Sequence, residues 1–376
     1  MSALQRPLPR NSPCQETAPA KKPREHLTLT STKTLRSLSE LAGAGLAADA
    51  EDAALRAVAA RYSVAVTPEV ATLIDRNDPA DPIARQFLPD ARELTTLPQE
   101  LADPIGDDAH SPVAGVVHRY PDRVLLKLLT VCPVYCRFCF RRETVGAGKG
   151  ALLGEAETTA ALDYIARTPQ IFEVILTGGD PLMLSARRLT AVARRLAEIE
   201  HVRILRVHSR APTAAPDLVS PERLAALKES GKALYLALHV NHARELSAPA
   251  RAAIATLRAA GVTLLSQTVL LAGVNDDAGV LETLMRDLLA LGVKPYYLHH
   301  PDLAPGTRHF RLNIEAGKRL YAELSRRLTG IGVPAYVLDI PGGFGKTPVM
   351  GLEADGAGGF HVTDRTGRVH VYRDHL

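Results

Sequence analysis

The sequence has no segment that could cross a membrane, because no stretch of its 376 residues approaches about 18 uninterrupted apolar residues. The N-terminal residues also lack the apolar stretch of about 7–15 residues that marks a secretory signal. From these two absences we expect a cytoplasmic protein with no membrane partner. Cysteine is scarce as well, and four cysteines in a cytoplasmic protein do not suggest a disulfide framework.

A basic surface for nucleic acid is also missing, although the whole chain carries a net charge of +4. Residues 1–25 hold five Lys and Arg against two Glu, which accounts for +3 of that charge. The other 351 residues carry 40 basic and 39 acidic side chains. We therefore expect no nucleic-acid partner. Residues 1–28 are rich in Pro, Ser, Gln and Lys, and this composition predicts a disordered tail.

From about residue 123 the sequence alternates short β-rich runs with amphipathic helical stretches. The strands are nearly continuously apolar, which is typical of parallel strands covered on both faces. Six β-then-α units are too few for a complete eight-fold barrel, so we expect an α/β fold with a partial (β/α)6 barrel. The expected strands are 124–130, 172–177, 202–207, 233–240, 262–270 and 294–299, and the helices lie near 155–167, 185–199, 221–230, 247–260, 277–291 and 312–328.

The regions on either side of this alternation have a different character. Residues 29–110 predict an N-terminal cap of helices and a long polar loop, packed on a barrel that spans 111–330. The C-terminal region, 331–376, predicts a further strand at 335–340, then a glycine-rich loop, and finally a β-hairpin made by 360–363 and 368–372.

Three of the four cysteines, Cys132, Cys136 and Cys139, fall in one loop directly after the first strand of the alternation. In barrel-like α/β folds, the active-site residues lie at the C-terminal ends of the strands, so this loop is a candidate metal site. A structural zinc ion normally takes four ligands and would have to borrow a histidine. A cubane iron–sulfur cluster held by three cysteines keeps one iron open for a small-molecule ligand. The residues therefore favour a [4Fe–4S] cluster, with zinc as the alternative.

The spacing C-x3-C-x2-C, with the aromatic Phe138 before the last cysteine, resembles that of the radical S-adenosylmethionine (radical SAM) enzymes. The resemblance implies that the open iron binds SAM and that electron transfer cleaves it to a 5′-deoxyadenosyl radical. It also implies a Gly-Gly element after the second strand that meets the SAM amine. Gly178, Gly179 and Asp180 stand there, although by themselves they predict a tight turn.

A second glycine-rich stretch, residues 339–348 (DIPGGFGKTP), contains Lys346. It is similar in composition to a phosphate-binding P-loop, but Ile340 occupies the position of the first required glycine and no helix pattern follows. A loop that presents one lysine also suits a Schiff base with pyridoxal 5′-phosphate (PLP). A flexible surface loop is the alternative interpretation of these residues alone.

Across about residues 60–350 the sequence resembles lysine 2,3-aminomutase and its close relatives. The motifs that carry this resemblance are 118–125 (HRYPDRVL), 139–142 (CFRR), 209–212 (SRAP), 267–271 (QTVLL) with 273–276 (GVND), 301–303 (PDL) with 309–310 (HF), and 341–346 (PGGFGK). The resemblance implies an isomerase in which Lys346 forms the Schiff base with PLP. It also implies that Arg119 and Arg123 hold the PLP phosphate and that His239 and Gln267 lie near SAM and PLP.

The resemblance further implies a substrate with a charge at each end. Asp302 and Asp339 match the acids that bind the ε-ammonium of lysine, and Arg141 matches the arginine that binds the carboxylate. Free L-lysine, converted to β-lysine, is therefore the expected substrate, and arginine is an alternative. A reductant protein such as flavodoxin or ferredoxin is the expected electron donor.

The sequence also departs from the longer family members, which carry extra cysteines for a zinc site at a subunit interface. Only Cys14 is left over here, so we expect no such zinc site and, if a homo-oligomer forms, a looser or different one. The shorter form resembles the branch that makes β-lysine for elongation factor P. Phe140 and Phe344 replace smaller residues of the family pattern. The remaining alternatives are a PLP-independent radical SAM enzyme and an iron–sulfur electron-transfer protein.

Overall fold

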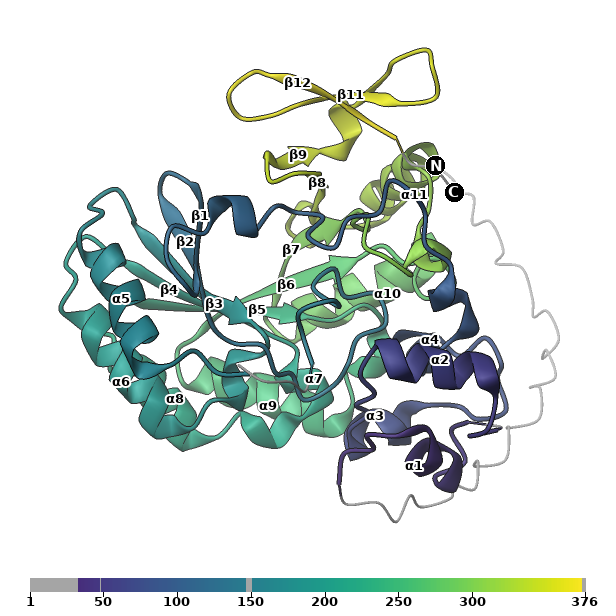
Figure 1. Cartoon of the computed structure of the whole chain (residues 1–376), viewed down its shortest axis with the longest axis horizontal. Coiled ribbons are helices and arrows are strands. Elements are labelled where there is room, and N and C mark those ends of the chain that lie inside the picture. Colours follow the sequence, from purple (N-terminus) through teal and green to yellow (C-terminus); the bar gives the residue numbers. More distant parts are fainter. Residues whose placement is uncertain (1–32, 48, 147–150, 374–376) are drawn as a thin grey trace, which may run out of the picture.

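The computed structural model describes residues 33–47, 49–146 and 151–373 (Figure 1). The expected disordered tail, 1–28, with Cys14, lies outside these residues. Among the described residues, no helix is long and apolar enough to cross a membrane.

The central element is a nine-stranded sheet whose strands lie in chain order from β1 to β9. Strands β2 to β8 are parallel to their neighbours, and β1 and β9 pair antiparallel at the two edges. The predicted partial (β/α)6 barrel is therefore confirmed, with β8 as the further strand that follows its six units. The strands are β1 Val116–Tyr120, β2 Arg123–Leu129, β3 Glu173–Gly178, β4 Ile204–Ser209, β5 Ala233–His239, β6 Thr263–Val269, β7 Lys294–His299, β8 Ala335–Ile340 and β9 Gly345–Pro348.

Helices connect the parallel strands and cover the outer face of the sheet (Figure 1). Their starts follow local capping chemistry: the Ser185 hydroxyl accepts from the Arg188 N–H at 3.3 Å, and Pro221 occupies the first turn of its helix. Leu189, Val192 and Leu196 recur on the buried face of α6, which packs them into the core. The connecting helices are α5 Glu155–Ala166, α6 Ala186–Ala197, α8 Pro221–Lys228, α9 Ala248–Ala259, α10 Ala278–Ala290 and α11 Ile314–Arg327, with the short α7 Ala211–Ala214 after β4.

The N-terminal segment packs beside the barrel as short helices with a small apolar core of their own (Figure 1). That core includes Val134, from the cysteine loop, and Ala214, from α7. The segment therefore rests directly on the loop that follows β2. Its elements are α1 Leu38–Gly43, α2 Ala53–Arg61, α3 Pro68–Leu73, α4 Pro82–Phe87 and the 3-10 helices η1 Ala91–Leu94 and η2 Asp108–His110.

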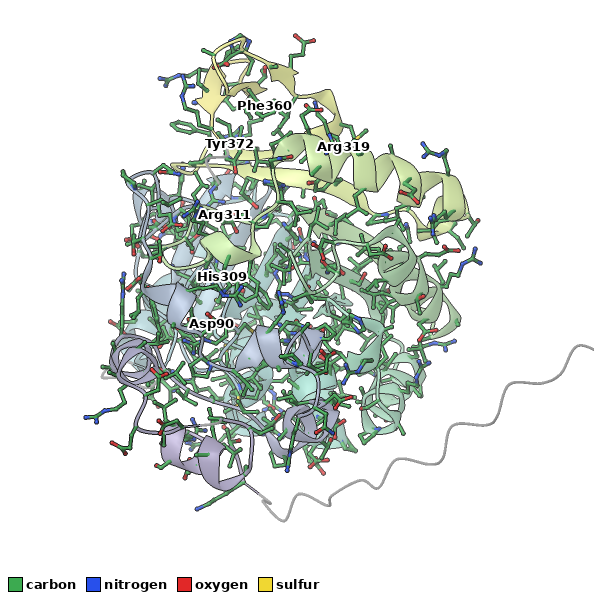
Figure 2. The ribbon with its side chains drawn as sticks, turned by 90° about the vertical axis from the view of Figure 1, so that its right-hand side faces the viewer. Asp90, His309, Arg311, Arg319, Phe360 and Tyr372 are labelled. Atoms are coloured by element: carbon green, nitrogen blue, oxygen red, sulfur yellow. The ribbon has the colours of Figure 1, made fainter. Side chains whose placement is uncertain are left out.

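The C-terminal region forms a separate three-stranded antiparallel sheet of β10 Glu353–Ala354, β11 Phe360–Thr363 and β12 Val369–Tyr372. Strands β11 and β12 confirm the predicted hairpin. In Figure 2, Phe360 and Tyr372 mark this sheet at the top of the molecule, and Asp90 marks the N-terminal segment below it. One detail differs from expectation: Lys346 lies on β9, paired with Asp339 of β8, and not in a loop.

Candidate active site

A cavity of about 260 Å³ lies at the C-terminal ends of the parallel strands. Strand ends from β2 to β8 contribute to its wall because parallel strands all finish at the same edge of a sheet. The cavity brings together all the residues to which the sequence analysis gave a role in binding or catalysis: Cys132, Cys136, Cys139, Arg119, Arg123, Arg141, Gly178, Gly179, Asp180, His239, Gln267, Asp302, Asp339 and Lys346.

The three cysteines are half-buried in the wall of the cavity, and Arg210 lies by Cys136 while Arg141 and Arg142 lie near Cys139. Burial raises the pKa of Cys139 to about 11 and the pKa of Cys132 well above its ordinary value. These thiols therefore become thiolates only against strong positive charge, such as iron. Among the described residues, no three His, Cys, Asp or Glu side chains lie at the spacing that a single metal ion requires. A cubane binds each thiolate through a different iron, and three thiolates from one loop are the donor set that such a cluster takes.

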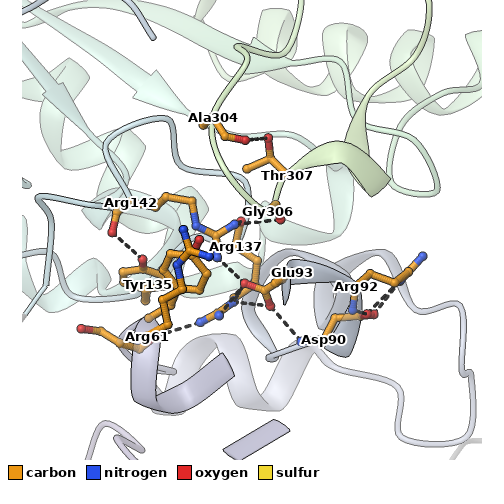
Figure 3. Close-up of polar contacts among 12 residues, drawn as sticks. Arg61, Asp90, Arg92, Glu93, Tyr135, Arg137, Arg142, Ala304, Gly306 and Thr307 are labelled. Atoms are coloured by element: carbon orange, nitrogen blue, oxygen red, sulfur yellow. Dashed lines mark hydrogen bonds and ion pairs between the residues drawn. The ribbon is translucent and has the colours of Figure 1, made fainter. Parts of the chain in front are cut away.

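The cysteine loop is held in place by a buried acid that the sequence did not reveal. The Glu93 carboxylate, on η1, accepts hydrogen bonds from Arg137 Nε at 2.9 and 3.0 Å and from Arg137 Nη2 at 2.6 Å. Arg142 Nη2 donates to the same carboxylate (Figure 3). All three side chains are 0% exposed. Because Arg137 lies between Cys136 and Cys139, Glu93 ties the N-terminal segment to the loop that holds the cluster ligands.

Gly178 and Gly179 bring the end of β3 against the backbone that precedes Cys132. The Gly179 N–H donates to the Leu129 carbonyl at 2.7 Å. A Cβ at Gly179 would lie 2.3 Å from the Val131 carbonyl oxygen, so no larger residue fits there. The Gly179 N–H is therefore already used within the fold and is not available to a ligand.

Asp180 has a positioning role in the structure. Its carboxylate accepts from the Ser209 hydroxyl at 2.9 and 3.0 Å, from the Arg210 and Ala211 N–H groups at 2.9 and 3.0 Å, and from the Leu182 N–H at 3.0 Å. These bonds tie the end of β3 to the end of β4, and they occupy both carboxylate oxygens.

The acidic end of the cavity is built around Lys346. Its Nζ lies 2.7 Å from both oxygens of Asp339, and its backbone N–H donates to the Tyr120 hydroxyl at 2.8 Å. Burial alone would raise the pKa of Asp339, but the Lys346 ammonium and His299 hold it well below its usual range. Burial and the neighbouring Asp339 carboxylate raise the pKa of Asp302 to about 8. At neutral pH, Asp339 is therefore ionised and Asp302 is mostly protonated.

The basic end of the cavity is organised by Asp107, another acid that the sequence did not reveal. Its carboxylate is 3.1 Å from Arg119 Nη2, 3.4 Å from Lys127 Nζ and 3.0 Å from Arg141 Nε. One buried carboxylate among three cations leaves a net positive region that suits anions. Arg119 Nε is buried and has no hydrogen-bond partner among the described residues, so it remains free to donate. The group therefore fits a phosphate and a carboxylate.

Arg123 stands apart from this group of cations. Its Nη1 donates to Asp122 at 2.8 Å, and its guanidinium lies 3.7 Å above the Tyr120 ring centroid. The same Tyr120 hydroxyl contacts the backbone of Lys346, so one aromatic side chain joins the arginine to the lysine. If PLP is bound in this cavity, Arg119 and Arg123 are cations that would hold its phosphate, and Lys346 is the amine that would hold its aldehyde.

Two histidines and an amide line the middle of the cavity. Burial lowers the pKa of His239 and of His208 well below the ordinary value, so both rings are neutral at neutral pH. His239 Nε2 is buried without a hydrogen-bond partner among the described residues. Gln267 Nε2 lies 3.5 Å from His208 Nε2. These groups can hydrogen-bond a polar ligand without adding charge.

The site contains further residues that no sequence motif marked. Glu93 and Asp107 sit in polar stretches where an acid predicts helix capping, and Glu93 does belong to a capping box with Asp90. On β4, His208 lies on the opposite face from the buried Leu205 and Val207. This alternation was a weak sequence indication that the His208 side chain faces the barrel interior.

Comparisons with known proteins agree with this geometry. The family model described as Radical SAM superfamily matches residues 126–284. The chain is 42% identical over 287 residues to L-lysine 2,3-aminomutase of Clostridium subterminale, covering 76% of this chain and 68% of that protein. It is 41% identical over 287 residues to L-lysine 2,3-aminomutase of Fusobacterium nucleatum, covering 76% and 67%. It is 36% identical over 303 residues to L-lysine 2,3-aminomutase of Escherichia coli, covering 80% and 88%. The chain thus belongs to the lysine 2,3-aminomutase family of radical SAM enzymes.

Proposed function

We propose that the protein converts L-lysine to β-lysine by moving the 2-amino group to carbon 3, with a [4Fe–4S] cluster, SAM and PLP as cofactors. The observation that carries the proposal is a cavity with two acids at one end and an arginine group at the other. A free amino acid with a cationic side chain matches both ends. The names of the relatives support lysine as that amino acid.

In this proposal Asp302 and Asp339 receive the ε-ammonium of lysine. Lys346 Nζ lies against both oxygens of Asp339, and if Lys346 held PLP, the Asp339 carboxylate would be available to the substrate. Asp302 is mostly protonated at neutral pH because burial and the Asp339 carboxylate raise its pKa to about 8. An arriving ammonium favours the ionised carboxylate, so Asp302 gives up that proton as lysine binds.

At the other end Arg141 would bind the lysine carboxylate, while Arg119 and Arg123 would bind the PLP phosphate. Asp107 accepts hydrogen bonds from Arg119 and Arg141 and fixes the spacing between them. A substrate bound by Arg141 at one end and by Asp302 and Asp339 at the other would have to span the cavity, which selects for its length. A glutamate side chain would be repelled by Asp302 and Asp339, which disfavours acidic amino acids.

When bound, the cluster and SAM supply a hydrogen-abstracting radical, and PLP supplies the electron-delocalising system that amino migration needs. The chain's own contribution is placement and exclusion of water. Cys132, Cys136 and Cys139 would hold three irons, and the Gly178 and Gly179 carbonyls would face the SAM amine. The His239 ring, whose centroid lies 5.5 Å from that of Phe138, is neutral and adds no charge to this part of the cavity.

The test is anaerobic incubation of reconstituted protein with L-lysine, SAM, PLP and dithionite, followed by chiral chromatography for β-lysine. Formation of β-lysine, lost in Lys346→Ala and kept in the surface control Lys228→Ala, is the expected result. If SAM is cleaved but lysine survives, the radical SAM chemistry stands and lysine is refuted as substrate; arginine is then the next amino acid to assay.

We also propose that a small reductant protein, flavodoxin or ferredoxin, delivers the electron in the cell. Replacing dithionite by reduced flavodoxin in the same assay tests this, and β-lysine should still form. We also propose a homo-oligomer, from the family resemblance alone. Sedimentation equilibrium of the enzyme with its cluster and PLP bound measures the mass of the particle and so the number of subunits.

A further inference from the structure

We propose that Arg210 raises the reduction potential of the cluster through a charge-assisted hydrogen bond to Cys136, and that Glu245 limits this effect. The inference rests on the proposed function in one respect, namely that the three cysteines hold a [4Fe–4S] cluster. Arg210 would then be a positioning and tuning residue of the enzyme, without touching the substrate.

The guanidinium of Arg210 is fixed from several sides. Its Nη1 donates to Cys136 Sγ at 3.2 Å, and its Nη2 donates to Glu245 Oε2 at 2.7 Å and to Gln86 Oε1 at 2.6 Å. Its Cζ lies 4.5 Å from the Phe87 ring centroid and 5.3 Å from the Phe138 ring centroid. The group is almost completely buried and cannot swing away from the sulfur.

Glu245 is fixed just as firmly, by the segment that follows β5. Its Oε1 accepts from the Asn241 and His242 N–H groups at 2.9 and 3.0 Å, and from Gln86 Nε2 at 3.3 Å. Three separate segments therefore meet at one buried ion pair: α4, the end of β4 and the segment after β5. A pair held this way keeps the same distance from Cys136 in both oxidation states of the cluster.

Reduction adds one electron to the cluster and makes it more negative. A guanidinium bonded to one of its thiolates stabilises the reduced form more than the oxidised form, so the potential rises. The nearby Glu245 carboxylate cancels part of this effect because it carries the opposite charge. Within the described residues, Arg210 makes the one cationic side-chain hydrogen bond to a cysteine sulfur. The Cys136 corner of the cluster is therefore electrostatically different from the other two.

The pair predicts shifts of opposite sign, which a merely structural role would not produce. In Arg210→Gln the equilibrium constant for one-electron reduction should fall by about tenfold, or about 59 mV. In Glu245→Gln the constant should rise, by a smaller factor, because Arg210 keeps its charge and loses its counter-charge. Arg311→Gln is the matched control: this buried arginine pairs with Glu100 and does not line the cavity, so its loss should leave the potential unchanged.

The experiment is a dithionite redox titration of the anaerobically reconstituted proteins, read by electron paramagnetic resonance without SAM, after iron and sulfide have been measured. Shifts in the same direction for Arg210→Gln and Glu245→Gln, or shifts no larger than that of Arg311→Gln, overturn the inference. If Arg210→Gln does not load a cluster, Glu245→Gln and the charge-conserving Arg210→Lys test the inference instead. A raised potential in Glu245→Gln together with a nearly unchanged potential in Arg210→Lys supports the inference. Any other pattern overturns it.

These outcomes separate the two proposals. A wild-type protein that binds no iron and sulfide refutes the proposed function, and the tuning role is refuted with it. A wild-type protein that loads a [4Fe–4S] cluster and makes β-lysine, with unshifted variants, refutes the tuning role alone.

Discussion

Replacing Glu93 by Gln should destabilise the protein more than any substitution of a surface acid. Glu93, Arg137 and Arg142 are all 0% exposed, so neither guanidinium can turn to water when the carboxylate charge is lost. Removing one partner of a buried ion pair costs about 3–5 kcal/mol. Gln keeps one oxygen acceptor, which puts the expected loss at the low end, about 3 kcal/mol. Out of a total stability of about 5–15 kcal/mol, this is a large fraction.

The matched control is Glu143→Gln, the same substitution in an ion pair near the surface. Glu143 and Arg61 lie 3.2 Å apart with side chains 28% and 41% exposed, so their interaction contributes only about 0–1 kcal/mol. Thermal unfolding of the two variants, followed by circular dichroism in reductant, should therefore differ by about 2 kcal/mol or more. The melting temperature of Glu93→Gln should be the lower by about 2–3 °C, because the unfolding entropy of a chain this long is about 0.8 kcal/mol per kelvin.

A second measurement links this stability to the cluster. Arg137 stands between two of the cysteines, so loosening its contact with Glu93 should also lower the iron content after reconstitution. Equal melting temperatures for Glu93→Gln and Glu143→Gln would refute the reasoning, because they would mean that the buried carboxylate is energetically equivalent to an exposed one.

Three further predictions concern the cavity itself. Asp339→Asn should lower kcat/KM for lysine at least tenfold, measured in steady-state assays, and near-wild-type turnover would rule out its role. The raised pKa of Asp302, about 8, means that its protonated form stabilises the fold at low pH and that this contribution is lost as pH rises through about 8. The melting temperature of the wild type should accordingly fall more between pH 6 and 9 than that of Asp302→Asn; equal slopes would contradict the assignment. Gly179→Ala should lower both stability and SAM binding, measured by calorimetry, because its Cβ would lie 2.3 Å from the Val131 oxygen. Gly351→Ala, with nothing within 4 Å of the added Cβ, should change neither.

Much of the fold followed from the alternation of apolar runs and helical periodicity. The strands β7 and β8 were predicted residue for residue, because each is a short β-rich run that is followed closely by a proline. Strand β9 was not predicted, since Gly345–Pro348 contains glycine and proline and no alternating pattern. It is a strand because β8 offers it an edge with which to pair, and that is a tertiary effect.

The register between β8 and β9 also explains a feature of the site that the motif could not give. Asp339 and Lys346 are seven residues apart in the sequence, and the antiparallel pairing places them directly opposite each other. The motif predicted separate partners for the two side chains, substrate for the acid and PLP for the lysine. In the structure, the Asp339 carboxylate and the Lys346 ammonium form an ion pair with each other.

The residues that sequence reasoning missed share a physical cause. Glu93, Asp107 and Gln86 all belong to the N-terminal segment, and each contacts an arginine that lies in a barrel motif. Of the three arginines, only Arg141 was predicted as a site residue, because the family motif assigns it a role, whereas the three partners stand in polar stretches with no periodic signal. Contacts such as that between Gln86 and Arg210, 124 positions apart, are set by packing of the segment on the barrel.

This distribution of charge decides how the N-terminal segment and the barrel depend on each other. The barrel motifs supply the guanidiniums of Arg119, Arg137 and Arg142, and the segment that ends near residue 110 supplies the carboxylates that neutralise them. A barrel without those carboxylates would bury several unpaired cations, which is far more costly than losing apolar contacts alone. The segment is therefore part of the active site's electrostatics, because its acids fix the direction of every arginine that they contact.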